Sequence, residues 1–166
     1  SDGKVKTFAG GAVAGSKDGK KGEAQLQEPS GVATDRNKQP LVAYIADTGN
    51  HRIRKVVESG VVTTFAGSDK GDKDGNGTQA QFNDPTGLAV DGDSNVYVAD
   101  RGNHRIRKIT KEGKVSTLAG SSEGYKDGEG TEAQFNGPTG LAVDSKGNVY
   151  VADTNNHRIR KITKEG

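Results

Sequence analysis

Apolar and polar residues alternate along several short runs of this chain. In the run NVYVAD, Val96 and Val98 lie on one face of an extended strand, and Tyr97 and Ala99 lie on the other. The runs GLAVD, HRIRKIT and KVSTLAG are similar, and they are rich in β-branched residues. Gly, Asn, Asp and Pro separate the runs, and connections such as DSKGN and TKEGK suit tight hairpins. The pattern predicts an all-β chain of short antiparallel strands.

These strands recur in groups of four, labelled A to D in chain order. His51, His104 and His157 are spaced 53 residues apart, and residues 62–110 match residues 115–163 at 36 of 49 positions. A four-stranded unit repeated at such a period is typical of β-propeller blades. The first copy is more diverged and carries three extra residues in RNKQPLVAYIAD. The chain therefore contains about three blades.

Each copy carries the same strand and turn motif. The three versions read GVATD…AYIADTGNHRI, GLAVD…NVYVADRGNHRI and GLAVD…NVYVADTNNHRI. On these residues the sequence resembles the NHL-repeat family, and the resemblance covers essentially the whole chain. It implies blades of a β-propeller. The period is longer than in the usual repeat of that family, because the connection from strand D to the next strand A is long.

We expect residues 1–166 to form a single domain. Blade 1 spans 29–67, blade 2 spans 85–120, and 138–163 supply strands A to C of blade 3. Residues 4–10 match the D strands VTTFAG and VSTLAG. Three blades cannot close a ring, and an open arc leaves strand edges bare. Two chains placed head to tail would close six blades as a homodimer, residues 4–10 of each completing the last blade of the other. The alternative is that the chain is an excised piece of a longer one.

The hexamer NHRIRK, present in every copy, is interpreted as architecture. It follows an Asp that ends strand B and lies at the turn into strand C. We expect positive φ at the turn positions Gly49, Gly102 and Asn155. We also expect an ion pair across each hairpin, between residues five apart. The expected pairs are Asp47 with Arg52, Asp100 with Arg105, and Asp153 with Arg158.

Two arrangements raise the question of a metal. Three His residues at equivalent positions could form a zinc site, but they start strand C, away from the propeller axis where strand A lies. Asp72, Asp74, Asn76 and Gly77 match the start of a calcium loop, yet its twelfth position is Asn83 rather than Glu. Loop-turn chemistry explains the second arrangement better. We expect no metal and no cofactor.

Charge changes this picture little. The net charge is +2, from 24 basic and 22 acidic residues of interspersed sign, which argues against a dedicated polyanion site. Only four Tyr and four Phe are available for base stacking, so nucleic acid is not an expected partner. No apolar run approaches the roughly 20 residues of a membrane-spanning helix, so no membrane partner is expected.

The predicted function is a non-catalytic binding scaffold for a protein or another ligand. Because strand direction alternates, the B–C turns and the D–A loops emerge on one face, where loops on a rigid frame can bind. No catalytic residue is assigned. The alternatives are a metal-dependent lyase or hydrolase with six blades, an RNA-binding propeller, and a self-assembling designed or structural fragment. The strand A starts carry hydroxyls, which are poor metal ligands. The candidate binding residues are Ser30, Thr48, Thr86, Arg101, Thr139 and Thr154.

Overall fold

The chain folds into three antiparallel sheets, as a computed structural model of residues 3–164 describes. The first sheet has the order β1-β2-β3-β4 and the last β10-β11-β12. The middle sheet has the order β5-β9-β8-β7-β6, in which β5 adds a two-residue outer edge. The strands are β1 (Pro29–Asp35), β2 (Val42–Asp47), β3 (Arg52–Val57), β4 (Val62–Ala66), β5 (Gly75–Asn76), β6 (Pro85–Val90), β7 (Val96–Asp100), β8 (Arg105–Ile109), β9 (Lys114–Ala119), β10 (Pro138–Val143), β11 (Val149–Asp153) and β12 (Arg158–Ile162).

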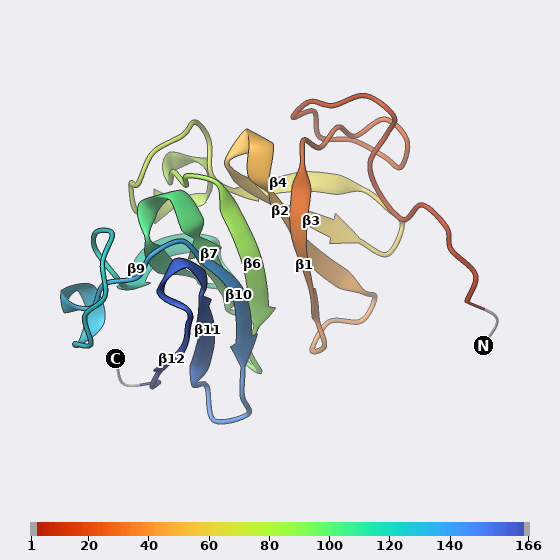
Figure 1. The fold of residues 1–166 in the computed structure, drawn as a ribbon. Helices are drawn as coiled ribbons and strands as arrows, with labels where there is room; N and C mark the ends of the chain where they lie inside the picture. The colour runs from red at the N-terminus through yellow and green to blue at the C-terminus, as the bar shows by residue number, and fades with distance from the viewer. Residues whose placement is uncertain (1–2, 165–166) are drawn as a thin grey trace.

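The sheets stand side by side as consecutive blades of a propeller (Figure 1). Their first strands form the inner edge of the arc, where β6 contacts β1 on one side and β10 on the other. Each later strand lies farther out. The D–A loops and the B–C turns gather at one end of the blades, the end where β1, β6 and β10 begin. The all-β propeller class predicted from the sequence is confirmed.

The core lies between neighbouring blades rather than within one sheet. One buried cluster joins Tyr44 and Ile53 of the first blade to Leu88 and Val98 of the second, and a similar cluster joins the second and third blades. Alternation along each strand sends one set of side chains to each side, so a blade buries both faces only between two neighbours. Phe82 and Phe135, from the D–A loops, are also buried in these clusters.

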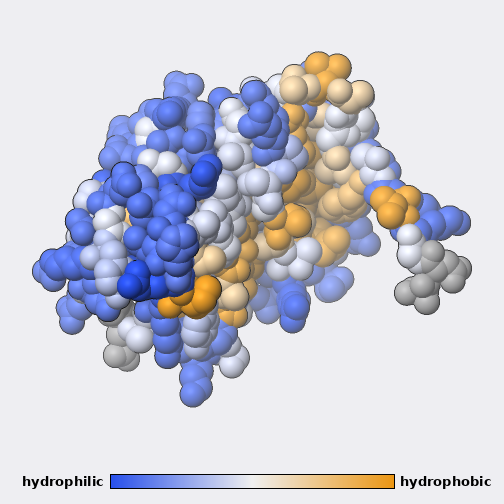
Figure 2. Space-filling model, viewed as in Figure 1, coloured by the Kyte–Doolittle hydropathy of each residue, from blue (hydrophilic) through white to orange (hydrophobic). Residues whose placement is uncertain are grey.

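Residues 4–10, expected as a D strand, form no strand within the single chain. Val5 is 93% exposed, whereas its counterparts Val62 and Val115 in β4 and β9 are buried. Apolar side chains gather over β1 and the N-terminal segment in Figure 2. Strand formation with a second chain therefore stays a prediction. In the described residues there is no helix of the length and apolar character that crossing a membrane requires.

Candidate functional site

A three-residue 3₁₀ turn joins strands B and C in every blade. The turns are Thr48–Asn50, Arg101–Asn103 and Thr154–Asn156. The residue that follows each turn is a His with a left-handed backbone, with φ of 54°, 55° and 57° at His51, His104 and His157. The prediction of positive φ at Gly49, Gly102 and Asn155 is wrong, because the reversal of the chain falls two residues later.

Close packing explains the turn glycines instead. A Cβ at Gly49 would lie 2.6 Å from Cγ of Gln27, and one at Gly102 would collide with the side chain of Asn83. The backbone N–H of each glycine also donates to the carbonyl of the same loop residue, at 2.9 and 2.8 Å. The D–A loop thus lies directly on the turn, and in the first two blades glycine leaves room for the side chain of the loop residue. In the third blade Asn155 takes this position, and its side chain donates to Oδ1 of Asn136 at 3.1 Å.

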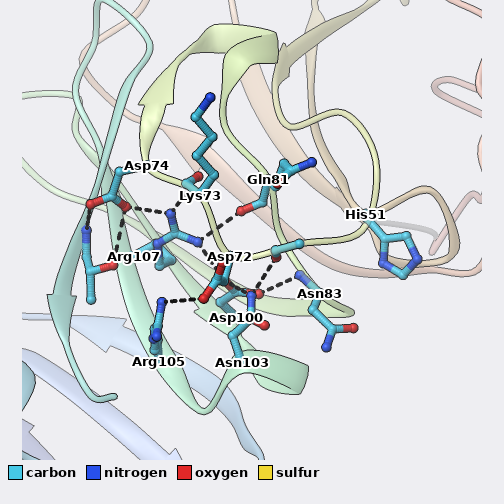
Figure 3. A network of polar contacts seen from close by, with 12 residues as sticks. His51, Asp72, Lys73, Asp74, Gln81, Asn83, Asp100, Asn103, Arg105 and Arg107 are labelled. Atoms are coloured by element: carbon cyan, nitrogen blue, oxygen red, sulfur yellow. Dashed lines mark hydrogen bonds and ion pairs between the residues drawn. The ribbon is translucent and has the colours of Figure 1, made fainter. Parts of the chain in front are cut away.

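The buried ion pair of each blade involves the second Arg of RIRK, not the first (Figure 3). Nη1 of Arg107 donates to Oδ2 of Asp100 at 2.7 Å, and both side chains are fully buried. The same pairs form between Arg54 and Asp47 at 2.6 Å and between Arg160 and Asp153 at 2.9 Å. The predicted pairs with Arg52, Arg105 and Arg158 are therefore wrong by two residues.

Strand geometry accounts for this difference. Arg105 and Arg107 point to the same face of β8, and Arg107 lies diagonally across from Asp100, within reach of a long side chain. Nε of Arg105 instead donates to the carbonyl of Ser121 at 3.1 Å. Burial raises the pKa of Asp100, while hydrogen bonds from Asn103 and Asn83 and the charge of Arg107 act in the opposite direction.

An Asp of each D–A loop completes this cluster. Asp74 accepts from Nη2 of Arg107 at 2.6 Å and from the backbone N–H of Thr117 in β9 at 3.2 Å. Asp18 accepts from Arg54 and Thr64 in the same way. Burial tends to raise the pKa of Asp18, but the bonds from Thr64 and Arg54 outweigh it and hold the pKa below its ordinary value. The acidic loop residues are thus used as structural acceptors, which favours the loop-turn interpretation over calcium.

Sequence reasoning missed the role of Asp18, Asp74 and Asp127. The signal was available, because the tripeptide KDG occurs at 17–19, 73–75 and 126–128, once in each loop. Only the folded structure shows that each loop lies over strand C, where its Asp accepts a hydrogen bond from the second Arg of RIRK.

The turn His residues connect one blade to the next. Nδ1 of His51 accepts a hydrogen bond from the backbone N–H of Asp84 at 3.1 Å, and Nδ1 of His104 accepts one from Gly137 at 3.1 Å. Among the described residues, no group of three or more His, Asp or Glu side chains could hold a metal. Because Arg54 and Arg107 are buried, one arginine of the basic hexamer is occupied inside each of the first two blades.

The predicted binding residues gather at the inner edge. Ser30, Thr86, Arg101, Thr139 and Thr154 line one shallow pocket of about 520 Å³, together with Gly87, Gly140 and Asn155. We call it the inner-edge pocket. Thr48 lies beside it, where it shares a hydrogen bond of 2.6 Å with Ser30 and donates to the carbonyl of Pro85.

Four hydroxyls and one guanidinium are among the groups that line this pocket. Thr139 and Thr154 share a hydrogen bond of 2.6 Å, and the hydroxyl of Thr86 reaches the carbonyl of Thr139 at 3.3 Å. Arg101 takes the place that Thr48 and Thr154 hold in the other blades. Its side chain is exposed and forms no hydrogen bond or ion pair with the described residues.

The sequence profile of the NHL repeat matches residues 82–109 and 135–162. Protein SUPPRESSOR OF QUENCHING 1, chloroplastic, of Arabidopsis thaliana is 37% identical over 149 residues, which are 81% of this chain and 14% of that protein. NHL repeat-containing protein 2 of Bos taurus is 32% identical over 157 residues, which are 86% of this chain and 22% of that protein. The chain thus spans less than a quarter of either relative.

Solved structures share the fold. An auxiliary nutrient binding protein from Bacteroides ovatus is 35% identical, with a TM-score of 0.65 over 74% of this chain and 34% of that one. Virginiamycin B lyase from Staphylococcus aureus is 18% identical, with a TM-score of 0.57 over 83% of this chain and 39% of that one. At that identity the likeness to the lyase concerns the fold alone.

Proposed function

The chain belongs to the NHL-repeat family, and on that premise we propose that it is a non-catalytic binding scaffold. Its ligand face is the one that carries the B–C turns and the D–A loops. The observation that carries the proposal is the inner-edge pocket, in which hydroxyls and an unpaired Arg101 face an open space. Likeness to an auxiliary nutrient binding protein at 35% identity supports binding as the activity.

The four hydroxyls and the guanidinium of the pocket suit a small polar ligand with a negative charge. Hydroxyls donate and accept hydrogen bonds, and a guanidinium binds a carboxylate through two parallel hydrogen bonds. Ser30, Thr139 and Thr154 are fixed by their own hydrogen bonds, so little side-chain freedom is lost on binding. These groups hold a ligand rather than transfer protons at neutral pH, which supports a scaffold over an enzyme.

The proposal includes a second copy of the chain as a partner, in a head-to-tail homodimer of six blades. The three strands of the inner edge form an arc, so the inner-edge pocket is open on one side. A second arc of three blades would enclose it and supply the same hydroxyls again. The bound site would then hold two copies of Arg101 on opposite sides.

Glucuronate and glucose test the ligand class, because they differ only by a carboxylate in place of a hydroxymethyl group. Isothermal titration should show that glucuronate binds more tightly than glucose. Arg101→Gln should reduce that preference about ten-fold or more, since the guanidinium is the charged group of the pocket. Arg36→Gln, on the exposed A–B hairpin, is the matched control and should change nothing. Equal binding of the two sugars by wild type, or an unchanged preference in Arg101→Gln, would refute the proposal.

A further inference from the structure

Identical residues occupy different environments in the three blades. Ile106, at the second position of strand C, is 0% exposed and so is Ile53, but Ile159 is 73% exposed. Val32, at the start of the first blade, is 69% exposed, whereas its counterpart Leu88 is buried. Inside the chain these two positions face each other across the space between blades. The two end faces of the arc therefore expose the residues that pack against each other between blades inside the chain.

The polar contacts between blades show the same difference. His51 and His104 each accept a backbone N–H from the next D–A loop, at Asp84 and Gly137. In the described part of the chain, His157 has no such donor and is exposed. The residue that matches Asp84 and Gly137 is Glu28, which already has their left-handed backbone, with φ of 50° compared with 50° and 58°. The N–H of Glu28 is thus preset for the acceptor on His157.

Strand D provides a third set of contacts. Asp18 and Asp74 each accept the backbone N–H of a Thr in strand D, at Thr64 and Thr117. Asp127 binds Arg160 at 2.6 Å, as Asp18 and Asp74 bind the arginines of their own blades. However, the side chain of Asp127 is 80% exposed, and in the described residues it accepts no backbone N–H from a strand D. The matching Thr of segment 4–10 is Thr7, which lies outside any strand.

At the inner edge, too, a contact that forms between blades inside the chain is missing at the end of the arc. A Cβ at Gly31 or Gly87 would collide with the carbonyl oxygen of the next strand A, at Thr86 or Thr139. Gly140 has the same sequence context, but the nearest atom to its Cβ would be Cβ of Ala152 at 3.6 Å. The carbonyl that matches Thr86 and Thr139 belongs to Ser30.

We infer that a second copy of this chain covers both end faces, and that each copy donates residues 4–10 as the outer strand of the other's last blade. This deepens the proposed homodimer and rests on it. The occupant is a second copy because each end face already has its complement at the opposite end, in the same register as the two interfaces formed within the chain. The trans contacts are then Asp127 with Thr7, His157 with Glu28, Ile159 with Val32, and Gly140 with Ser30.

The register within the chain fixes the register between chains. Lys55 opposes Thr63 in the first blade, and Lys108 opposes Ser116 in the second. The same pairing places Lys6 opposite Lys161 of the partner subunit. Like charges directly opposite weaken a strand pair, so this one position departs from complementarity.

Cysteine pairing tests this register directly, because the chain contains no cysteine. Lys6→Cys/Lys161→Cys should form a disulfide-linked dimer under mild oxidation, since directly opposed residues lie within disulfide range. Lys6→Cys/Lys108→Cys is the matched control and should not cross-link, because Lys108 already faces Ser116. Separately, Lys6→Thr should tighten the dimer several-fold at low salt and less at high salt, which a misfolded variant would not do.

Light scattering on the wild-type chain separates the possible failures. A mass of twice 17.3 kDa is expected. A stable monomer or a trimer would overturn the dimer and the strand donation together, and would leave the ligand proposal to the sugar titration. A dimer whose Lys6→Cys/Lys161→Cys variant fails to cross-link, or whose control variant cross-links as well, would overturn the donated strand alone. A disulfide within one chain would overturn it too.

Discussion

Replacing Arg107 by Met removes the guanidinium at the centre of the second blade but keeps a long apolar side chain. Arg107 binds Asp100 at 2.7 Å, Asp74 at 2.6 Å and the carbonyls of Gln81 and Lys73 at 3.0 and 3.1 Å. The guanidinium carbon of Arg107 also lies 5.2 Å from the centroid of the Phe82 ring, in a cation–π contact. After the change, Asp100 keeps only the donors of Asn103 and Asn83, both at 2.8 Å.

The expected cost is large relative to the stability of a domain. Breaking a buried ion pair by removal of one partner costs about 3–5 kcal/mol, because the other charge stays buried. A single domain has a free energy of unfolding of about 5–15 kcal/mol, so Arg107→Met removes about a fifth of it or more. Arg105→Met is the matched control, two residues away on the same strand. Its partner Asp72 is mostly exposed at 3.3 Å, which predicts about 1 kcal/mol or less.

Urea denaturation followed by far-ultraviolet circular dichroism measures both variants, at one fixed protein concentration because an assembly would couple to folding. Arg107→Met should lower the midpoint strongly and Arg105→Met slightly. Adding Asp100→Asn to Arg107→Met should recover part of the loss, since no buried charge then lacks a partner. Equal costs for the two arginines, or a larger cost for Arg105→Met, would refute the assignment of the buried pair.

Two further predictions concern the D–A loops. Gly102→Ala should cost about 1–3 kcal/mol through overpacking against Asn83, whereas Gly92→Ala, with no atom within 4 Å of its Cβ, should be neutral in the same urea titration. The lowered pKa of Asp18 stabilises the fold above the unfolded pKa of about 4, and this contribution is lost as pH falls through the lower folded value. Wild type should therefore exceed Asp18→Asn in free energy of unfolding above about pH 4, and the gap should close in more acidic buffer; a gap that widens on acidification would contradict the sign of the shift.

The sequence alone determined the blades. Alternation at period two, turn residues between runs and the 53-residue repeat are local or strictly periodic, so they predicted the strands and their order without coordinates. Likewise, Ser30, Thr86, Arg101, Thr139 and Thr154 were expected on one face because strand direction alternates, and they line one pocket.

Only the tertiary structure decided which arginine is buried. Arg105 and Arg107 are two residues apart and point to the same face of β8, so no pattern distinguishes them. The D–A loop that carries Asp74 covers Arg107 and leaves Arg105 partly exposed, and the path of that loop is a long-range property. The left-handed backbone of the turn His could not be predicted for a related reason, because a 3₁₀ turn moves the reversal of the chain two residues along.

Tertiary structure also gives different burial to residues that have the same sequence context. Ile106 and Ile159 share the motif HRIRKIT, yet one is 0% and the other 73% exposed. Burial in a propeller depends on the neighbouring blade, which is a property of the arc and not of the motif. The repeat determined what each blade is, and the place of a blade in the arc determined which of its faces is covered.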